Sequence, residues 1–205
     1  MSHGRPFRFA VQGGPFADAP ALQEHARQVE DLGSCELYSF DHVGAPDPFV
    51  PLVVAALATS TLRIGPLVIN NELHNTALLA RTAATVAALT DNRLVLGIGS
   101  GYMESEHEAI DLAIRPPGPR VARLGESLGA LRELLDTGTV TTDGEHIRLD
   151  VADLGLPTEP GAVPFLIGAH GPKMLQLAGR YADIFQFTVS DGTNTSGPGD
   201  AGVTM

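Results

Sequence analysis

Apolar residues along the chain follow two alternating rhythms. Short apolar runs typical of strands are followed by longer stretches in which apolar residues recur every three or four positions, as on one helix face. We expect strands over 8–12, 35–40, 62–70, 93–99, 164–168 and 184–189. We expect helices over 19–32, 49–60, 76–89, 121–135 and 172–183. Strands that alternate with helices predict a parallel sheet and an α/β fold.

Residues that favour helix starts precede three of these helices. Asp18, Asp47 and Asn75 can each accept hydrogen bonds from the free N–H groups of a first turn. The helix after Asn75 presents one apolar face, made of Leu79, Ala83, Val86 and Leu89. These signals support the helix assignments independently of the apolar rhythm.

Two places depart from the alternation. Pro66 has no N–H group to donate inside the third strand, so we expect a bulge there. Asp143-Gly144 separates two alternating runs, which predicts a small β-hairpin insertion near 139–149.

Two architectures fit this order of elements, an open doubly wound sheet and a (β/α)₈ barrel. His42, His74, His107 and His170 each follow a predicted strand. In a barrel these strand ends meet around one mouth, where active sites are built. In an open sheet they would be spread along an edge, and polar residues in loops are common in either fold. The histidines favour a TIM-barrel type of fold.

The sequence contains six predicted barrel strands, enough for about six βα units. A full barrel needs eight such units. We expect one domain over 1–189 and a flexible tail over 190–205, which is rich in Gly, Ser and Thr. On this interpretation the barrel is incomplete, with no sequence for strands seven and eight.

Charge and composition exclude several classes of protein. The net charge of −11 and the single lysine, Lys173, argue against binding to nucleic acid. No apolar run approaches the roughly 20 residues of a membrane span. The single cysteine, Cys35, excludes an internal disulfide framework. A cytoplasmic protein without membrane partners is therefore expected.

The fourth strand ends in three glycines, Gly97, Gly99 and Gly101, within the sequence RLVLGIGSGYMESEHEAI. A dinucleotide-binding turn would need another glycine where Tyr102 stands, and it would open the first βα unit. A P-loop needs a G-K-[ST] sequence, which does not occur in the chain. Neither common phosphate-binding turn explains these glycines.

A metal site is a further alternative. Asp41, His42, His74 and His170 could act as ligands from separate strand ends. None of them has the short spacing that makes such an assignment specific. We therefore predict no metal.

Three separated motifs carry a resemblance to a known family. They are FDHVG after the second strand, VINNELHNTALLARTAATVAALTDNRLVLGIGSGYMESEHEAI across the third and fourth, and PFLIGAHGPKMLQLAGRYADI at the fifth. In these residues the chain resembles the bacterial luciferase-like monooxygenase superfamily, and within it the branch that uses the deazaflavin coenzyme F420. The resemblance implies a (β/α)₈ barrel that binds F420 or FMN at its C-terminal mouth, often as a dimer.

The resemblance also implies where the cofactor lies. The end of strand four would run under its ring, with the glycines keeping this wall flat and Ser100 donating or accepting hydrogen bonds; glycine needed only for packing is the alternative. Family members commonly back the ring with a bulge and a non-prolyl cis peptide, for which Asn70-Asn71 occupies the matching place. The residues expected to bind cofactor here are Asn70, Asn71, Gly97, Gly99, Ser100, Gly101 and Tyr102.

The start of the fifth helix is a candidate phosphate site. Gly168 and Gly171 free the backbone between a strand and a helix, and exposed N–H groups with the helix dipole favour an anion there. Lys173 lies in the first turn, where a solvent-exposed lysine is equally expected. Ala169 and His170 are also included in the expected site, although many relatives have a second glycine where they stand.

The catalytic residues are expected around the second and fourth strand ends. Asp41-His42 resembles an acid–histidine pair that lies near the reactive ring in deazaflavin relatives. His42 would act as general acid or base with Asp41 fixing its tautomer, although a structural histidine at a strand end is the alternative. Glu106, with His107 beside it, falls in a loop that borders substrate in relatives.

These features together predict an oxidoreductase that transfers hydride between F420 and a small organic substrate. Reduced FMN with oxygen is the alternative cofactor chemistry. A shortened, non-catalytic flavin-binding or partner protein is the alternative function. A homodimer or a barrel-completing partner chain is expected, because open sheet edges expose unpaired backbone groups.

Overall fold

The structure is a computed structural model that describes residues 7–13, 17–155, 159–169 and 171–187. The strands are β1 (Ala10–Gln12), β2 (Glu36–Ser39), β3 (Arg63–Pro66), β4 (Ile69–Asn70), β5 (Leu96–Gly99), β6 (Val140–Asp143), β7 (Arg148–Val151), β8 (Phe165–Ala169) and β9 (Ile184–Phe187). The helices are α1 (Ala19–Asp31), α2 (Val50–Leu57), the 3₁₀ turn η1 (Asn71–Leu73), α3 (Thr76–Leu89), α4 (Glu104–Ala109), α5 (Pro117–Thr137) and α6 (Pro172–Tyr181).

The barrel strands are all parallel and follow one another in chain order. One sheet has the order β1-β2-β3 and the other β4-β5-β8-β9. A bridge between Ile64 and Leu94 joins the two sheets. In a doubly wound sheet the strand order reverses at a switch point, whereas here each strand neighbours its predecessor, as in a barrel. The predicted barrel type is confirmed, and within the described residues the strands form an open arc.

The third barrel strand is interrupted where the sequence has Pro66. β3 ends at Pro66 and β4 begins at Ile69. A non-prolyl cis peptide joins Leu67 to Val68 between them. The irregularity predicted from Pro66 is confirmed, but the placement of a cis peptide at Asn70-Asn71 is wrong by three residues.

Most helices begin where the sequence predicts. The side chain of Asp18 accepts from the N–H of Ala21, and that of Asn75 accepts from the N–H groups of Ala77 and Leu78. α5 starts at Pro117, earlier than expected, because prolines suit a first helical turn. It ends at Gly138, whose positive φ of 76° forms a left-handed cap.

Two details of the helices were predicted wrongly. Glu106 and His107 lie in the short helix α4, not in a loop. Leu89 is exposed at the end of α3, whereas Leu79, Ala83 and Val86 are buried as expected.

Side chains alternate along β5 and the two residues before it, and so divide the surrounding core into two layers. Leu94, Leu96 and Ile98 point outward and pack against α3 and α5 in the main core. Val95 points inward and packs with Tyr38 and Leu166 inside the arc, where partly buried Leu67, Val68 and Ile184 join them. The glycines of this strand therefore continue its inward face.

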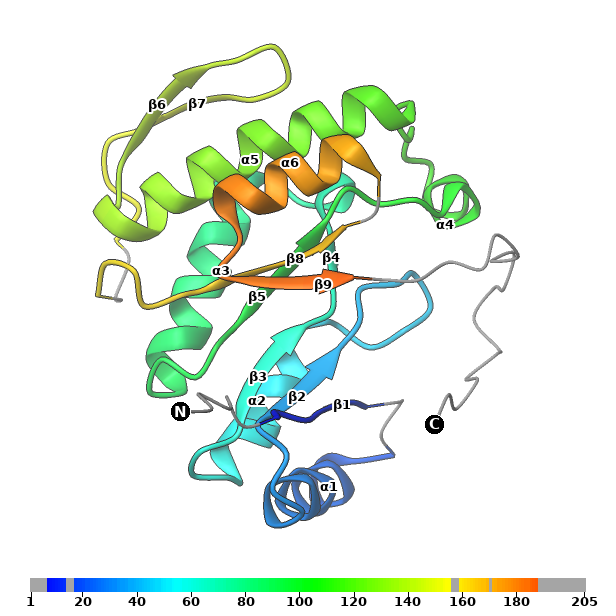
Figure 1. Cartoon of the computed structure of the whole chain (residues 1–205), viewed down its shortest axis with the longest axis vertical. Helices are drawn as coiled ribbons and strands as arrows, with labels where there is room; N and C mark the ends of the chain where they lie inside the picture. The colour runs from blue at the N-terminus through cyan, green and yellow to red at the C-terminus, as the bar shows by residue number, and fades with distance from the viewer. Residues whose placement is uncertain (1–6, 14–16, 156–158, 170, 188–205) are drawn as a thin grey trace, which may run out of the picture.

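The predicted hairpin is confirmed outside the barrel. β6 and β7 pair antiparallel from Val140↔Val151 to Asp143↔Arg148. The connection is longer than a two-residue turn, since β6 ends at Asp143 and β7 begins at Arg148. Within it, the N–H groups of His146 and Ile147 donate to the Glu126 carboxylate of α5. Figure 1 shows the hairpin beyond α5, which lies beside α6 over β8 and β9.

Candidate active site

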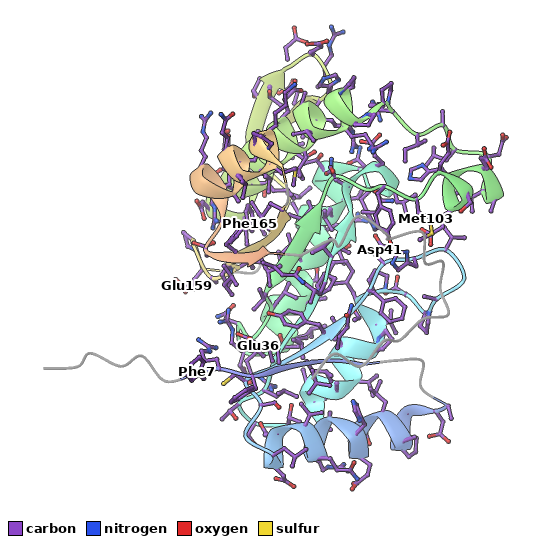
Figure 2. The ribbon with its side chains drawn as sticks, turned by 45° about the vertical axis from the view of Figure 1, so that its right-hand side comes forward. Phe7, Glu36, Asp41, Met103, Glu159 and Phe165 are labelled. Atoms are coloured by element: carbon purple, nitrogen blue, oxygen red, sulfur yellow. The ribbon has the colours of Figure 1, made fainter. Side chains whose placement is uncertain are left out.

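The candidate site residues gather at the carboxyl ends of the barrel strands. Figure 2 shows Asp41 and Met103 at this end of the molecule, with Phe7 and Glu36 toward the opposite end. We call this end the mouth; it comprises the segments after β2, β4, β5 and β8. Parallel strands bring residues that are distant in the sequence to one edge, as predicted.

The central feature of the mouth is a pair formed by His42 and Glu106. Nδ1 of His42 lies 2.8 Å from Oε1 of Glu106. Glu106 is buried, and His42 is partly exposed. The His42 ring also lies edge-on to Tyr102, with 6.2 Å between ring centroids. A buried carboxylate on Nδ1 fixes the histidine tautomer and leaves Nε2 for another partner.

Asp41 has a different partner from the one predicted. Its Oδ2 lies 2.8 Å from Nε2 of His74 and accepts a hydrogen bond from the Asn70 N–H at 2.9 Å. Asp41 therefore ties the segment after β2 to the turn after β4. The prediction that Asp41 fixes the tautomer of His42 is wrong, because Glu106 occupies that position.

Asn70 and Asn71 are built into the wall of the mouth, and both are buried. The Asn70 side chain accepts from the N–H of Glu72 at 3.1 Å, and its Nδ2 lies 3.1 Å from Nε2 of His107. Since Oδ1 is an acceptor here, Nδ2 is the donor to Nε2, and neutral His107 carries its proton on Nδ1. With these contacts Asn70 supports the wall, and we do not assign it to a cofactor.

Two buried donors at this wall have no hydrogen-bond partner among the described residues. They are Nδ1 of His107 and Nδ2 of Asn71. Such groups are rare in folded proteins and are usually met by water or a ligand. Nδ2 of Asn71 is closed off from solvent in this arrangement, so its binding to a cofactor stays a prediction.

The strand-end glycines make room for the interrupted strand. A Cβ on Gly97 would lie 2.0 Å from the carbonyl oxygen of Pro66, and one on Gly99 would lie 2.9 Å from Cγ2 of Val68. Close packing against the interrupted strand therefore requires glycine at both positions, as the packing alternative predicts. Val68, which the sequence analysis did not single out, lies against the glycine positions; its only signal in the sequence was the nearby Pro66.

Gly101 and Tyr102 complete the loop after β5. Gly101 has a φ of +74°, and a Cβ there would lie 2.1 Å from Oδ1 of Asn70. Tyr102 is largely exposed, yet the pKa of its hydroxyl is raised, first by desolvation and then by the charge of Glu106. Ser100, which precedes Gly101, is partly exposed and so remains accessible to a ligand.

The start of α6 has the geometry expected of a strand-to-helix turn. Gly171 has a φ of +81° and precedes Pro172, the first residue of α6. Lys173 is exposed in the first turn, while Ala169 is buried and Gly168 partly buried. His170 lies outside the described residues. The phosphate role of this turn stays a prediction.

Sequence reasoning missed a charged cluster behind the wall. Glu72 pairs with Arg115 at 2.9 Å and with Arg123 at 3.4 Å. These residues come from η1, the segment before α5, and α5 itself, so only the fold brings them together. Among the described residues, no group of three or more His, Cys, Asp or Glu side chains is arranged to hold a metal ion.

A family model described as luciferase-like monooxygenase matches residues 4–195 of this chain. The chain belongs to this family. The three motifs that carry the sequence resemblance lie within this match, and they include the segments after β2, β4, β5 and β8 that form the mouth.

Luciferase-like relatives with known names include F420 enzymes. The chain is 32% identical over 176 residues to 5,10-methylenetetrahydromethanopterin reductase of Archaeoglobus fulgidus, covering 86% of this chain and 51% of the relative. It is 30% identical over 202 residues to F420-dependent glucose-6-phosphate dehydrogenase of Kineococcus radiotolerans, covering 93% and 59%. The chain thus spans between half and three fifths of the length of these two relatives.

Solved structures have the same fold at lower identity. The F420-dependent tetrahydromethanopterin reductase of Methanopyrus kandleri superposes with a TM-score of 0.77 at 22% identity, covering 88% of this chain and 55% of that one. An FMN complex of the oxygenating constituent of 3,6-diketocamphane monooxygenase from Pseudomonas putida superposes with a TM-score of 0.67 at 17% identity, covering 84% and 54%. No helix within the described ranges is long and apolar enough to cross a bilayer.

Proposed function

We propose that this luciferase-like chain carries the catalytic mouth of an F420-dependent oxidoreductase that exchanges hydride with a small organic substrate. The observation that carries the proposal is the His42–Glu106 pair, with 2.8 Å between Nδ1 and Oε1. The F420-dependent glucose-6-phosphate dehydrogenase among the relatives supports the choice of cofactor.

His42 is the proton donor or acceptor in this proposal. Glu106 holds the Nδ1–H, so the Nε2 lone pair is available to accept a proton from an alcohol or, once protonated, to return it to a carbonyl oxygen. Glu106 is a positioning residue and stabilises the charged imidazolium when it forms. Tyr102, edge-on to His42, lines the same side.

The residues that would hold F420 fit a flat ring and an anionic tail. Val68 against Gly97 and Gly99 offers an apolar backing surface without a protruding side chain on β5. The partly exposed Ser100 hydroxyl offers a hydrogen bond. Gly171 and Lys173 at the start of α6 would take a phosphate. Bound F420 supplies the hydride chemistry, and the protein supplies orientation and the proton.

A homodimer is proposed from the surface of α2. This helix is apolar on all sides, yet Val50 is 64% and Leu57 is 69% exposed. A helix that is apolar all round is normally buried, and these two residues share one face of the helix. A second copy of α2 would cover this face. A barrel-completing partner and the cytoplasmic location stay predictions.

A cofactor titration with matched variants tests the proposal. Purified protein is titrated with F420 and separately with FMN, followed by fluorescence, and then assayed for F420 reduction with a panel of alcohols and sugar phosphates. We expect F420 binding in wild type and in His42→Ala, with turnover lost only in the variant. Failure of the folded protein to bind F420 would contradict the proposal, and binding of FMN alone would assign monooxygenase chemistry instead.

A further inference from the structure

Arg123 of helix α5 forms hydrogen bonds with the turn that follows β4, behind the mouth. Nη2 of Arg123 donates to the carbonyl oxygen of His74 at 2.9 Å, and Nη1 donates to the carbonyl oxygen of Asn71. The same Nη1 lies 3.4 Å from the carboxylate of Glu72. One guanidinium therefore contacts three residues of the turn that follows β4, namely Asn71, Glu72 and His74.

The turn is the anchor of the first mouth segment. The N–H of Asn70 and Nε2 of His74 both reach Oδ2 of Asp41, at 2.9 Å and 2.8 Å. Asp41 is adjacent to His42 in the chain. The grip of Arg123 on this turn is thus connected, through Asp41, to the backbone that carries the His42 ring.

The turn also contacts the other half of the central pair. The amide of Asn70 binds His107, which follows Glu106 on α4. The contacts form a closed path from Asn70 to Asp41, along the chain to His42, across to Glu106, and along the chain to His107 and back. A displacement of the turn would act on His42 and Glu106 together.

Burial explains why an arginine is needed at this place. The side chain of Glu72 is 1% exposed and that of Arg123 is 11% exposed, whereas that of Arg115 is 44% exposed. Desolvation lowers the pKa of Arg123, Glu72 raises it, and Arg115 lowers it further. Arginine stays charged in such a setting and offers several donors in a planar fork, while a lysine offers one compact charge.

We propose that Arg123 is a positioning residue for the proton-transfer pair, holding the turn after β4 in the place that aligns His42 with Glu106. The inference rests on the proposed function for its catalytic consequence. It adds a residue of helix α5 that reaches the predicted cofactor residues through the main-chain carbonyl of Asn71.

The same helix provides a matched control. Arg132 makes the same kinds of contact, two carbonyl oxygens and one carboxylate, at the opposite end of the strands. Its guanidinium lies 3.4 Å from the carbonyl oxygens of Val163 and Tyr181 and 2.7 Å from the carboxylate of Asp183. Loss of this grip should cost stability without disturbing the mouth.

The test compares Arg123→Lys with Arg132→Lys in the full chain. Thermal unfolding first establishes how much stability each variant loses. The ring nitrogens of His42 and His74 are then followed by ¹⁵N NMR without any cofactor, since these resonances report the tautomer and hydrogen bonding of each ring. Steady-state rates with F420 complete the comparison. If Arg123→Lys does not fold, Glu72→Gln disturbs the same cluster from the other side.

We expect Arg123→Lys to shift the ring-nitrogen resonances of His74 and His42 and to lower kcat on the order of tenfold, with KM for F420 changed less than about twofold. Arg132→Lys should leave both unchanged. Equal shifts in the two variants, or none in either, would overturn the positioning role. Lack of turnover by wild type would contradict the proposed function alone, because the NMR comparison needs no cofactor.

Discussion

Nδ1 of His42 and Oε1 of Glu106 meet at 2.8 Å although 64 residues separate them in the sequence. His42 follows β2 and Glu106 lies in α4 after β5, with the interrupted strand β3–β4 between them in the sheet order. The contact therefore spans an intervening strand end. A pair built this way depends on the curvature of the sheet, which brings alternate strand ends toward one another.

The first prediction concerns the charge of Glu106. Glu106→Gln keeps the shape of the side chain but removes the charge that stabilises a protonated His42. We expect kcat for F420 reduction to fall by about 10²-fold or more, within the range of general acid–base contributions. His146→Ala, in the hairpin outside the barrel, serves as the control and should retain wild-type kcat.

A second prediction concerns the close approach of β5 to the interrupted strand. Gly97→Ala places a methyl group 2.0 Å from the Pro66 carbonyl oxygen, so one of the two backbones must move. We expect a loss of about 1–3 kcal/mol or more in the free energy of unfolding, measured by chemical denaturation.

Gly179→Ala is the matched control for this change. Gly179 lies inside α6, and a Cβ there would meet no atom within 4 Å. Alanine in a helix interior should instead stabilise the protein by roughly 0.5–1 kcal/mol. If both variants lost stability equally, the steric account of Gly97 would be wrong.

A third prediction links Glu30 to acid stability. Its carboxylate accepts from the N–H groups of Ser60, Thr61 and Leu62, at distances down to 2.6 Å. Burial acts to raise the pKa of Glu30, but the hydrogen bonds from Thr61, Leu62 and Ser60 together outweigh it and the pKa is lowered. The folded state therefore binds the proton less readily than the unfolded state.

The sign of the pH dependence follows from this lowered pKa. The stabilisation is fully present above the ordinary carboxyl pKa and is lost as the pH falls through the lowered value. Glu30→Gln should be less stable than wild type by about 1–2 kcal/mol at neutral pH, and the difference should shrink in acid. A pH-independent difference in urea denaturation would contradict this account.

The fourth prediction tests the α2 surface. Leu57→Asp places a charge on the exposed apolar face and should shift the protein toward monomer in sizing chromatography. Leu175→Asp changes an exposed leucine on α6, at the other end of the strand order, and should leave the elution volume unchanged. A wild-type protein that elutes as a monomer at all concentrations would refute the α2 dimer.

Much of the fold could be predicted from local signals. Asp18 and Asn75 cap the helices expected after them, and the apolar rhythm of β5 matches its two packed faces. The early start of α5 was not predicted, since the prolines around Pro117 read equally well as an irregular loop. The short helix α4 has no apolar rhythm long enough to reveal it.

The sequence predicted which strand ends form the site, but not which side chains contact one another there. Sequence placed His42, Asp41 and Glu106 near one mouth, but adjacency in the chain suggested the wrong carboxylate for His42. The side chains of neighbouring residues diverge, so Asp41 reaches His74 while His42 reaches Glu106. The grip of Arg123 on η1 had no local signal, because it joins residues about 50 positions apart.

The two arginines of α5 also restrict how this helix can change. Arg123 and Arg132 are about two and a half helical turns apart, so their guanidinium groups leave the helix on nearly opposite sides. One inserted residue between them would rotate the second arginine by about 100° relative to the first and break one of the two grips. Insertions and deletions in this part of the molecule should therefore occur in the β6–β7 hairpin that follows. The segment from Arg123 to Arg132 should keep a constant length, because it spans the distance between the two ends of the sheet.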